Sequence, residues 1–420
     1  MVPAHTALFT GVVPCVHAQF SNTGEGTMNP AFVALAIAAF VSGANLRLFD
    51  ALLPTIAEDF SVAPTVASVV ITAFTLAYGL FQIVHGPLGD RVGRLRTVAI
   101  AMAIACLGSL GSAIAPTLPQ LTLLRFITGI GAAGIIPVSI AWIADHTPYD
   151  RRQATLGRFI GFILMGQILG PALGGALAEW FTWRDVFFVF TAVFLMVSIV
   201  LFRVDYTSRK ASSAGHVAQA QQSNILQTYL EILRNPWVRT VLLTVAVEGI
   251  LFYGTFAYTG AWLKEKFDLS YLLIGAILAG FGLGGVVYSL LVKWLLIRLH
   301  ETGFATIGAS ILMLFYLALP LTPTWYAIGP LCVVGGFGFY MLHNTLQTKA
   351  TEMWPAARGT AISAFAFSLF CGQALGVALF GRVIAALGYD WTFVATGVAL
   401  LLLGVRFAWR LRGVRHLPNP

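Results

Sequence analysis

Residues 86–96 read G-P-L-G-D-R-V-G-R-L-R and stand between two apolar runs, near residues 66–87 and 97–116. The three glycines of this stretch allow helix ends to approach each other and turn tightly. Its one carboxylate and three guanidinium groups place charge of both signs where two apolar helices meet water. The stretch therefore predicts a short connection at a membrane surface, with a membrane-spanning helix on either side.

The composition of the whole chain supports a membrane protein. Of the 420 residues, 58% are apolar and 10% are charged, whereas soluble domains carry about 45–50% and 25%. A mean hydropathy of +0.83 leaves too few charged side chains for one solvated surface, which argues against a water-soluble enzyme. The apolar runs are continuous and do not alternate with polar residues, so they predict helices and not the strands of a barrel.

We expect an all-α polytopic membrane protein with twelve transmembrane helices. The predicted spans lie near residues 30–53, 66–87, 97–116, 118–144, 154–177, 184–203, 238–262, 271–293, 303–320, 325–347, 359–386 and 391–409. Nineteen of the 25 Lys and Arg residues fall on the even-numbered connections and the C-terminal tail. Because cytoplasmic connections are rich in these residues, both termini are expected in the cytoplasm, which requires an even number of spans. The net charge of +8 follows this distribution and does not predict a nucleic-acid partner.

Two short features carry little functional signal. The four cysteines, Cys15, Cys106, Cys332 and Cys371, are widely scattered and predict neither a metal site nor a disulfide framework. Residues 1–29 lack the basic region and apolar core of a secretory signal. We expect them to form a disordered extension, with Met28 as an alternative start of the chain.

An internal repeat divides the chain into halves. Residues 166–175 read G-Q-I-L-G-P-A-L-G-G and residues 372–381 read G-Q-A-L-G-V-A-L-F-G, seven identities in ten at an offset of 206 residues. Spans 5 and 11 therefore occupy equivalent places in two six-helix bundles, predicted at residues 30–204 and 238–410. Between them, residues 205–237 are predicted to form a cytoplasmic linker, and residues 411–420 a cytoplasmic tail.

The second part of the linker has apolar residues at helical spacing. It predicts an amphipathic helix on the cytoplasmic face. The apolar positions are Ile225, Leu226, Tyr229, Ile232, Leu233 and Trp237.

The stretch 86–96 resembles the loop signature G-x-L-x-D-R-x-G-R-[KR] of the major facilitator superfamily (MFS), with Leu95 at a usually basic position. From Met28 to about Trp409 the chain resembles the twelve-span drug and proton antiporter branch of this superfamily, which implies two pseudo-symmetric bundles. The resemblance also implies that Asp90 engages the N-terminus of span 11 when the cytoplasmic side is closed. The alternative is that the arginines only set topology. The expected gating loop comprises Gly86, Gly89, Asp90, Arg91, Gly93, Arg94 and Arg96.

Two further stretches resemble MFS signatures. Residues 125–134, R-F-I-T-G-I-G-A-A-G, resemble the span 4 pattern, which implies a role of Arg125 in proton transfer; the alternative is an arginine tied to backbone carbonyls. Residues 166–175 resemble the antiporter signature G-x-x-x-G-P-x-x-G-G, which favours export. Its positions are Gly166, Gly170, Pro171, Gly174 and Gly175.

Proton coupling requires titratable groups inside the membrane. Asp50 and Glu248 are the only acidic residues within the predicted spans, so they are the first candidates, with Arg47 and Arg125 beside them. Arg47 precedes Asp50 by three residues on the same helix face, so the two form either a fixed ion pair or a responsive site. Polar and aromatic residues on the spans are candidates for the substrate cavity. They are Asn45, Tyr78, Gln82, Gln167, Tyr253, Tyr258, His343, Asn344, Gln347 and Gln373.

We expect a proton-coupled exporter (antiporter) of a small organic molecule that works by alternating access. An MFS importer or facilitator of a small metabolite such as a sugar is the alternative, and a receptor or scaffold is disfavoured because no soluble domain is present. No P-loop, metal or nucleophile constellation suggests an enzyme or a cofactor. The expected partners are the substrate, protons and the lipid of a bacterial inner membrane, in which the chain is expected to be a monomer.

Overall fold

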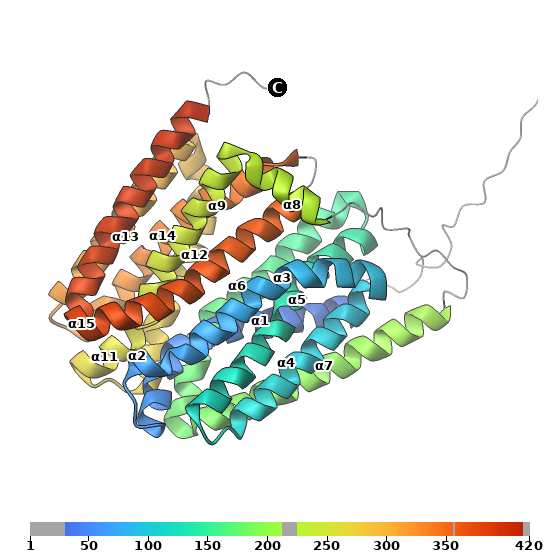
Figure 1. Cartoon of the computed structure of the whole chain (residues 1–420), viewed down its shortest axis with the longest axis horizontal. Coiled ribbons are helices and arrows are strands. Elements are labelled where there is room, and N and C mark those ends of the chain that lie inside the picture. The colour runs from blue at the N-terminus through green and yellow to red at the C-terminus, as the bar shows by residue number, and fades with distance from the viewer. Residues whose placement is uncertain (1–29, 212–224, 356–357, 415–420) are drawn as a thin grey trace, which may run out of the picture.

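The computed structural model describes residues 30–211, 225–355 and 358–414. These residues form helices joined by short connections, and no strand occurs among them (Figure 1). The predicted all-α polytopic fold is confirmed. The expected N-terminal extension, the middle of the linker and the end of the C-terminal tail lie outside the described residues.

The N-terminal half of the chain supplies the first six crossings. A short helix α2 precedes α3, and together they form the second crossing. The helices are α1 (Pro30–Asp59), α2 (Pro64–Ala67), α3 (Val69–Val92), α4 (Arg94–Ala113), α5 (Leu118–His146), α6 (Tyr149–Trp180) and α7 (Trp183–Ala211).

The C-terminal half begins with α8 (Ile225–Arg234). Its seventh crossing is composite, because a π-helical turn η1 interrupts the α-helix. The elements are α9 (Pro236–Glu248), η1 (Gly249–Tyr253), α10 (Gly254–Phe256), α11 (Thr259–Phe267), α12 (Tyr271–Arg298), α13 (Glu301–Leu321), the 3-10 turn η2 (Trp325–Ala327), α14 (Ile328–Glu352) and α15 (Arg358–Val414).

Helix α15 contains the last two crossings. Among the described residues eleven helical segments are long and apolar enough to span a membrane, and the last of them has 55 residues. At about 1.5 Å per residue it would be roughly 80 Å long, more than twice a hydrocarbon core of about 30 Å. Gly388, with φ 77° and ψ 173°, breaks it into residues 358–387 and 389–414. The chain therefore makes twelve crossings.

Two helix ends differ from the sequence prediction. Helix α7 continues to Ala211, beyond the predicted end of span 6, because residues 204–211 contain neither Gly nor Pro. The predicted amphipathic helix does not reach Trp237. Asn235 caps a new helix there, its Oδ1 accepting from Trp237 N at 2.8 Å, and Pro236 takes the first helical position.

The connections lie at two ends of the molecule. We call the end that holds the α3–α4, α5–α6, α12–α13 and α14–α15 connections the basic end, because most Lys and Arg residues are there. The opposite end holds the α1–α2, α4–α5, α6–α7 and α11–α12 connections and Gly388. In Figure 1 the blue-to-green helices of the N-terminal half fill one side and the yellow-to-red helices of the C-terminal half the other.

The internal repeat appears in the packing. Backbone close to Gly166 and Gly170 of α6 leaves no room for a Cβ, and the neighbours are Phe40 and Ala44 of α1. Gly372 and Gly376 of α15 meet Ala246 and Ile250 in the same way, again 206 residues later. Small residues let membrane helices pack backbone to backbone, which is how bundles gain contact energy in lipid.

The two halves meet closely at the opposite end. Helices α6 and α12 pack together, as do α3 and the first arm of α15. The hydrophobic core of the N-terminal half extends to Tyr258, Val377 and Ile384 of the other half. The Tyr258 hydroxyl donates to the Val377 carbonyl at 2.6 Å and lies 2.7 Å from Ser68 Oγ of α2–α3. These contacts hold the opposite end closed in this structure.

Candidate functional site

Glu248 is fully buried at the end of α9, with a partner on α14. Nδ1 of His343 lies 2.8 Å from its Oε2, within hydrogen-bond distance. The second carboxylate oxygen, Oε1, has no hydrogen-bond partner among the described residues. A buried ionised carboxylate is unfavourable by several kcal/mol unless a partner compensates its charge. For Glu248 the hydrogen-bonding partner is His343.

Aromatic rings surround this pair. His343 stacks on Phe339 with ring centroids 5.0 Å apart, and Phe339 lies 4.5 Å from Phe252. Phe252 belongs to η1, the π-helical turn that starts directly after Glu248. Such turns often occur at functional sites because the extra residue redirects side chains. The rings bury Glu248 completely and leave His343 12% exposed, and a low-polarity surrounding strengthens the interaction between the two groups.

Arg47 and Asp50 form a second pair, on α1. Their side chains are about 10% and 2% exposed, and the closest nitrogen and oxygen are 3.6 Å apart. This distance is an ion pair without a well-formed hydrogen bond, and Oδ2 of Asp50 has no hydrogen-bond partner among the described residues.

A contact between the halves joins the two pairs. The guanidinium carbon of Arg47 lies 3.8 Å from the ring centroid of Tyr253, the last residue of η1. Its charge also acts on Tyr316 and Tyr340. We call Arg47, Asp50, Glu248, Tyr253 and His343 the central cluster. The sequence singled out all five residues, and the structure places four of them in two pairs, with Tyr253 between the pairs.

Arg125 lies apart from the central cluster. Its guanidinium donates to Asn45 Oδ1 at 3.0 Å and lies 3.8 Å from the ring of Phe49 and 4.1 Å from that of Phe74. At 100° per residue, Asn45 and Phe49 occupy the face of α1 that is turned away from Arg47 and Asp50. Among the described residues no carboxylate pairs with Arg125. Aromatic rings and the Asn45 amide surround this buried arginine. The alternative given from the sequence had backbone carbonyls in their place.

The other cavity candidates lie at several places. Tyr78 is buried against Phe370 of α15, with ring centroids 4.6 Å apart, and Gln373 is buried beside η1. Tyr258 lies at the opposite end, where its hydroxyl is already bonded. Asn344 faces Tyr288 of α12, away from Glu248. Gln82 and Gln167 are half-buried, and Gln347 is exposed.

The gating loop is anchored to its own half. Arg94 pairs with Asp145 and donates to the Ala141 carbonyl oxygen, both on α5. Gly93, between α3 and α4, has φ 103°, a conformation that other residues rarely adopt.

The other members of the loop lie at different depths. Arg91 and Arg96 are exposed, whereas Leu95 is buried in the core. The side chain of Asp90 lies outside the described residues, so its predicted role remains a prediction. Gly86 has open space around it, and Gly89 contacts Val138.

The span 5 motif has two packing faces. Gly166, Gly170 and Gly174 contact α1 of the same half. Pro171 and Gly175 face α12 of the other half, where a Cβ on Gly175 would collide with the Tyr271 carbonyl. The motif therefore forms part of the contact between the halves.

A family model described as the Major Facilitator Superfamily matches residues 35–368. The chain belongs to this superfamily. It is therefore a transporter and not an enzyme, as the sequence predicted.

Relatives and solved structures agree with this family. The transporter is 26% identical to the uncharacterized MFS-type transporter YceJ of Bacillus subtilis, over 81% of this chain and 86% of that one. It is 24% identical to a multi-drug resistance efflux pump PmrA homolog of Lactococcus lactis, over 86% and 85%. A bacterial homolog of the human lysosomal transporter Spinster, solved inward-facing and unoccupied, superposes with a TM-score of 0.75 at 18% identity, covering 94% of this chain and all of that one.

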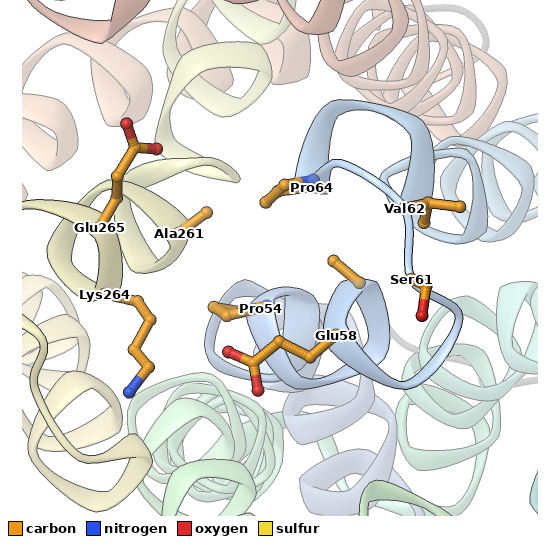
Figure 2. A pocket seen from close by; sticks show the side chains of 9 residues that line it. Pro54, Glu58, Ser61, Val62, Pro64, Ala261, Lys264 and Glu265 are labelled. Atoms are coloured by element: carbon orange, nitrogen blue, oxygen red, sulfur yellow. The ribbon is translucent and has the colours of Figure 1, made fainter.

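One pocket lies at the opposite end of the transporter, between α1–α2 and α11 (Figure 2). It measures about 220 Å³, below the range of about 300–1,000 Å³ for small-molecule sites. Glu58 on α1 and Lys264 on α11 line opposite sides of it in Figure 2. We do not assign the substrate to it, because it is small and far along the helices from Glu248. Its lining comprises Pro54, Ala57, Glu58, Ser61, Val62, Pro64, Ala261, Lys264 and Glu265.

Sequence reasoning missed three features of the site. The π-helical turn η1 has no simple sequence signal, since G-I-L-F-Y is compatible with an ordinary helix. Tyr316 and Tyr340 were not singled out, because aromatic residues are common on all spans. Asp145 could have been found: an acidic residue at the Arg-rich end of a span is a natural partner for a loop arginine.

Proposed function

We propose that this transporter exports a small organic molecule in exchange for protons, by alternating access to one central site. The observation that carries the proposal is the Glu248–His343 pair, a fully buried carboxylate that lies within hydrogen-bond distance of a histidine and keeps one oxygen unpartnered. A group of this kind changes charge when a proton or a cationic or hydrogen-bonding substrate arrives. A proton and a substrate cannot occupy the carboxylate oxygens of Glu248 at the same time.

The central cluster supplies a reason why occupancy changes conformation. Glu248 and His343 belong to the C-terminal half, and Arg47 and Asp50 to the other. Arg47 lies on Tyr253 across the boundary in this closed state of the opposite end. Rocking of the halves separates Arg47 from Tyr253 and leaves it paired with Asp50 alone. The charges of Asp50 and Glu248 are therefore compensated differently in the two states.

The direction of transport rests on two supports. The span 5 motif resembles that of antiporters, and one relative is named as a multi-drug efflux pump homolog. The basic end is cytoplasmic by the positive-inside rule. Both termini then lie on the cytoplasmic side of what we expect to be a bacterial inner membrane. Closure of the opposite end then makes this structure inward-facing. We expect it to act as a monomer.

The gating loop completes the cycle at the basic end. In the outward-facing state, Asp90 binds the N-terminus of the first arm of α15, where unpaired N–H groups and the helix dipole favour an anion. Arg94, held by Asp145, fixes the turn that presents Asp90.

The test is uptake into inverted membrane vesicles with an acidic lumen. We would offer a panel of lipophilic cations, neutral antibiotics and pentoses to the wild type, Glu248→Gln and His343→Gln. The wild type is expected to accumulate at least one compound only while the pH gradient lasts. Both variants should equilibrate it without accumulation.

A matched control is Glu265→Gln, an exposed glutamate later in the same crossing, which should behave as the wild type. Equal uptake by the wild type with and without the gradient would replace antiport by the facilitator alternative. Coupled uptake by Glu248→Gln would remove this residue from the mechanism.

A further inference from the structure

The N-terminus of α12 is capped by a residue of the other half. Oε2 of Glu179, one residue before the end of α6, accepts from the backbone N–H groups of Tyr271 at 2.9 Å and Leu272 at 3.4 Å. The next N–H, of Leu273, donates to Ser270 Oγ of α12's own cap at 3.3 Å. Helix N-termini carry unpaired N–H groups and partial positive charge, so a carboxylate there is stabilising.

The side chain of Tyr271 makes a second bond between the halves. Its hydroxyl donates to Oε2 of Glu58 on α1 at 2.6 Å. Lys264 does not compete for this carboxylate through a close bond, because its ammonium group donates to Asp268 at 2.8 Å. This hydrogen bond lowers the pKa of Asp268, which keeps this carboxylate ionised. Residue 271 is therefore held by α6 through its backbone and by α1 through its hydroxyl.

The helix backbones meet one turn below these bonds. A Cβ on Gly175 would collide with the Tyr271 carbonyl, and a Cβ on Gly275 with the Pro171 carbonyl. Closure of the opposite end thus brings α6 and α12 into backbone contact at the level where Glu179 reaches the helix end. Opening moves the halves apart and leaves Tyr271 and Leu272 without this acceptor.

We propose that Glu179, with Tyr271 as its receiver and Glu58 as a second anchor, forms the latch that holds the opposite end of the transporter closed. Glu179 is a positioning residue, since it acts on the balance between conformations and does not touch the central cluster. The proposal rests on the alternating access of the proposed function, and it is independent of the coupling ion and of the substrate.

The test measures access to a residue that the latch covers. Ala57 is 2% exposed and lines the pocket between the halves at this end. In a chain whose native cysteines are replaced, Ala57→Cys reports opening through its rate of reaction with a membrane-impermeant maleimide added to intact cells. Loss of an N-cap acceptor shifts a two-state equilibrium about fivefold. Glu179→Ala should therefore raise the labelling rate by about fivefold.

Further variants separate the latch from a general loss of structure. Tyr271→Phe removes only the Glu58 bond, and Glu179→Gln keeps a neutral acceptor, so both are expected to give smaller increases. Asp185→Ala removes an exposed acid at the same end whose bonds to Thr182 stay within α7's own cap, and it should leave the rate unchanged. Equal labelling of Glu179→Ala, Tyr271→Phe and Asp185→Ala would overturn the proposal, whatever the result for proton coupling.

Discussion

A carboxylate in the interior of a membrane bundle is stable only with a partner, and Glu248 and Asp50 have partners of different kinds. Glu248 has a histidine, whose ring nitrogens can donate or accept a hydrogen bond, at 2.8 Å. Asp50 has an arginine, which stays charged, at the longer distance of 3.6 Å. In the proposed mechanism the two sites differ in role: the Glu248 pair binds and releases the proton, whereas Arg47, which contacts both Asp50 and Tyr253 in this structure, loses its contact with Tyr253 when the halves rock.

The role of Asp50 is tested by Asp50→Asn. The amide keeps the size of the side chain but cannot compensate Arg47, so the cycle loses the state in which Arg47 leaves Tyr253. We expect accumulation against a gradient to be abolished while the protein reaches the membrane at normal amounts. Uptake in vesicles over a range of pH values measures this. An unchanged pH dependence would exclude Asp50 as a coupling group.

The sequence predicted the members of the central cluster and the pairing of Arg47 with Asp50, but not the pairing of Glu248 with His343. Asp50 and Glu248 stood out because acids inside apolar spans are rare, and Arg47 because it precedes Asp50 by three residues. The partnership of Glu248 with His343 joins residues 95 positions apart and depends on how α9 and α14 face each other. Arg125 was grouped with them because it matches the span 4 signature and is charged, but in the structure it lies on α5 and contacts Asn45 and Phe49, on the other face of α1.

At the scale of helices, glycine positions set how closely the helices approach. Gly166 faces the backbone of α1, whereas Gly161 of the same helix has open space around it. A leucine at 166 must push α6 away from α1, and such overpacking costs about 1–3 kcal/mol.

We predict that Gly166→Leu lowers the thermal unfolding temperature of the purified transporter by several degrees. Gly161→Leu is the matched control and should change it little. The measurement is the unfolding midpoint in detergent, followed by tryptophan fluorescence. Equal midpoints for the two variants would contradict the close α1–α6 contact.

Most elements could be predicted from apolar runs, and the exceptions have identifiable causes. The dipeptide Asn235-Pro236 is a cap followed by a first-turn proline, a signal that was present but was outweighed by the helical spacing up to Trp237. The π-helical turn after Glu248 packs against α15, where Gly249 faces the Leu369 carbonyl. This contact joins distant parts of the chain, so the local sequence does not predict the turn.

At the scale of the whole molecule, we propose that the transporter has a latch at each end. In these proposals Glu179 of α6 holds the opposite end by binding the N-terminus of α12, and Asp90 of α3 holds the basic end by binding the N-terminus of the first arm of α15. The two devices share one physical principle, an acid of the N-terminal half at a helix N-terminus of the C-terminal half. The repeat at 206 residues predicted the two bundles, but only the packed structure brings Glu179 to α12.

We predict that Asp90→Ala slows transport by about two- to fivefold, the equivalent of losing one charge at a helix N-terminus. Its expression should stay normal, because Gly93 and the Arg94–Asp145 pair still form the turn. Initial rates of gradient-driven uptake, normalised to the amount of protein, measure the effect. Normal turnover in this variant would remove the latch at the basic end.

The exchange of substrate for protons is tested most directly by the pH of the vesicle lumen. A transported compound is added outside inverted vesicles at equal pH on both sides, and a trapped dye reports the lumen. The account predicts that the lumen becomes alkaline as the compound enters, and that Glu248→Gln abolishes this change. A lumen that stays constant, or becomes acidic, during uptake by the wild type would contradict antiport.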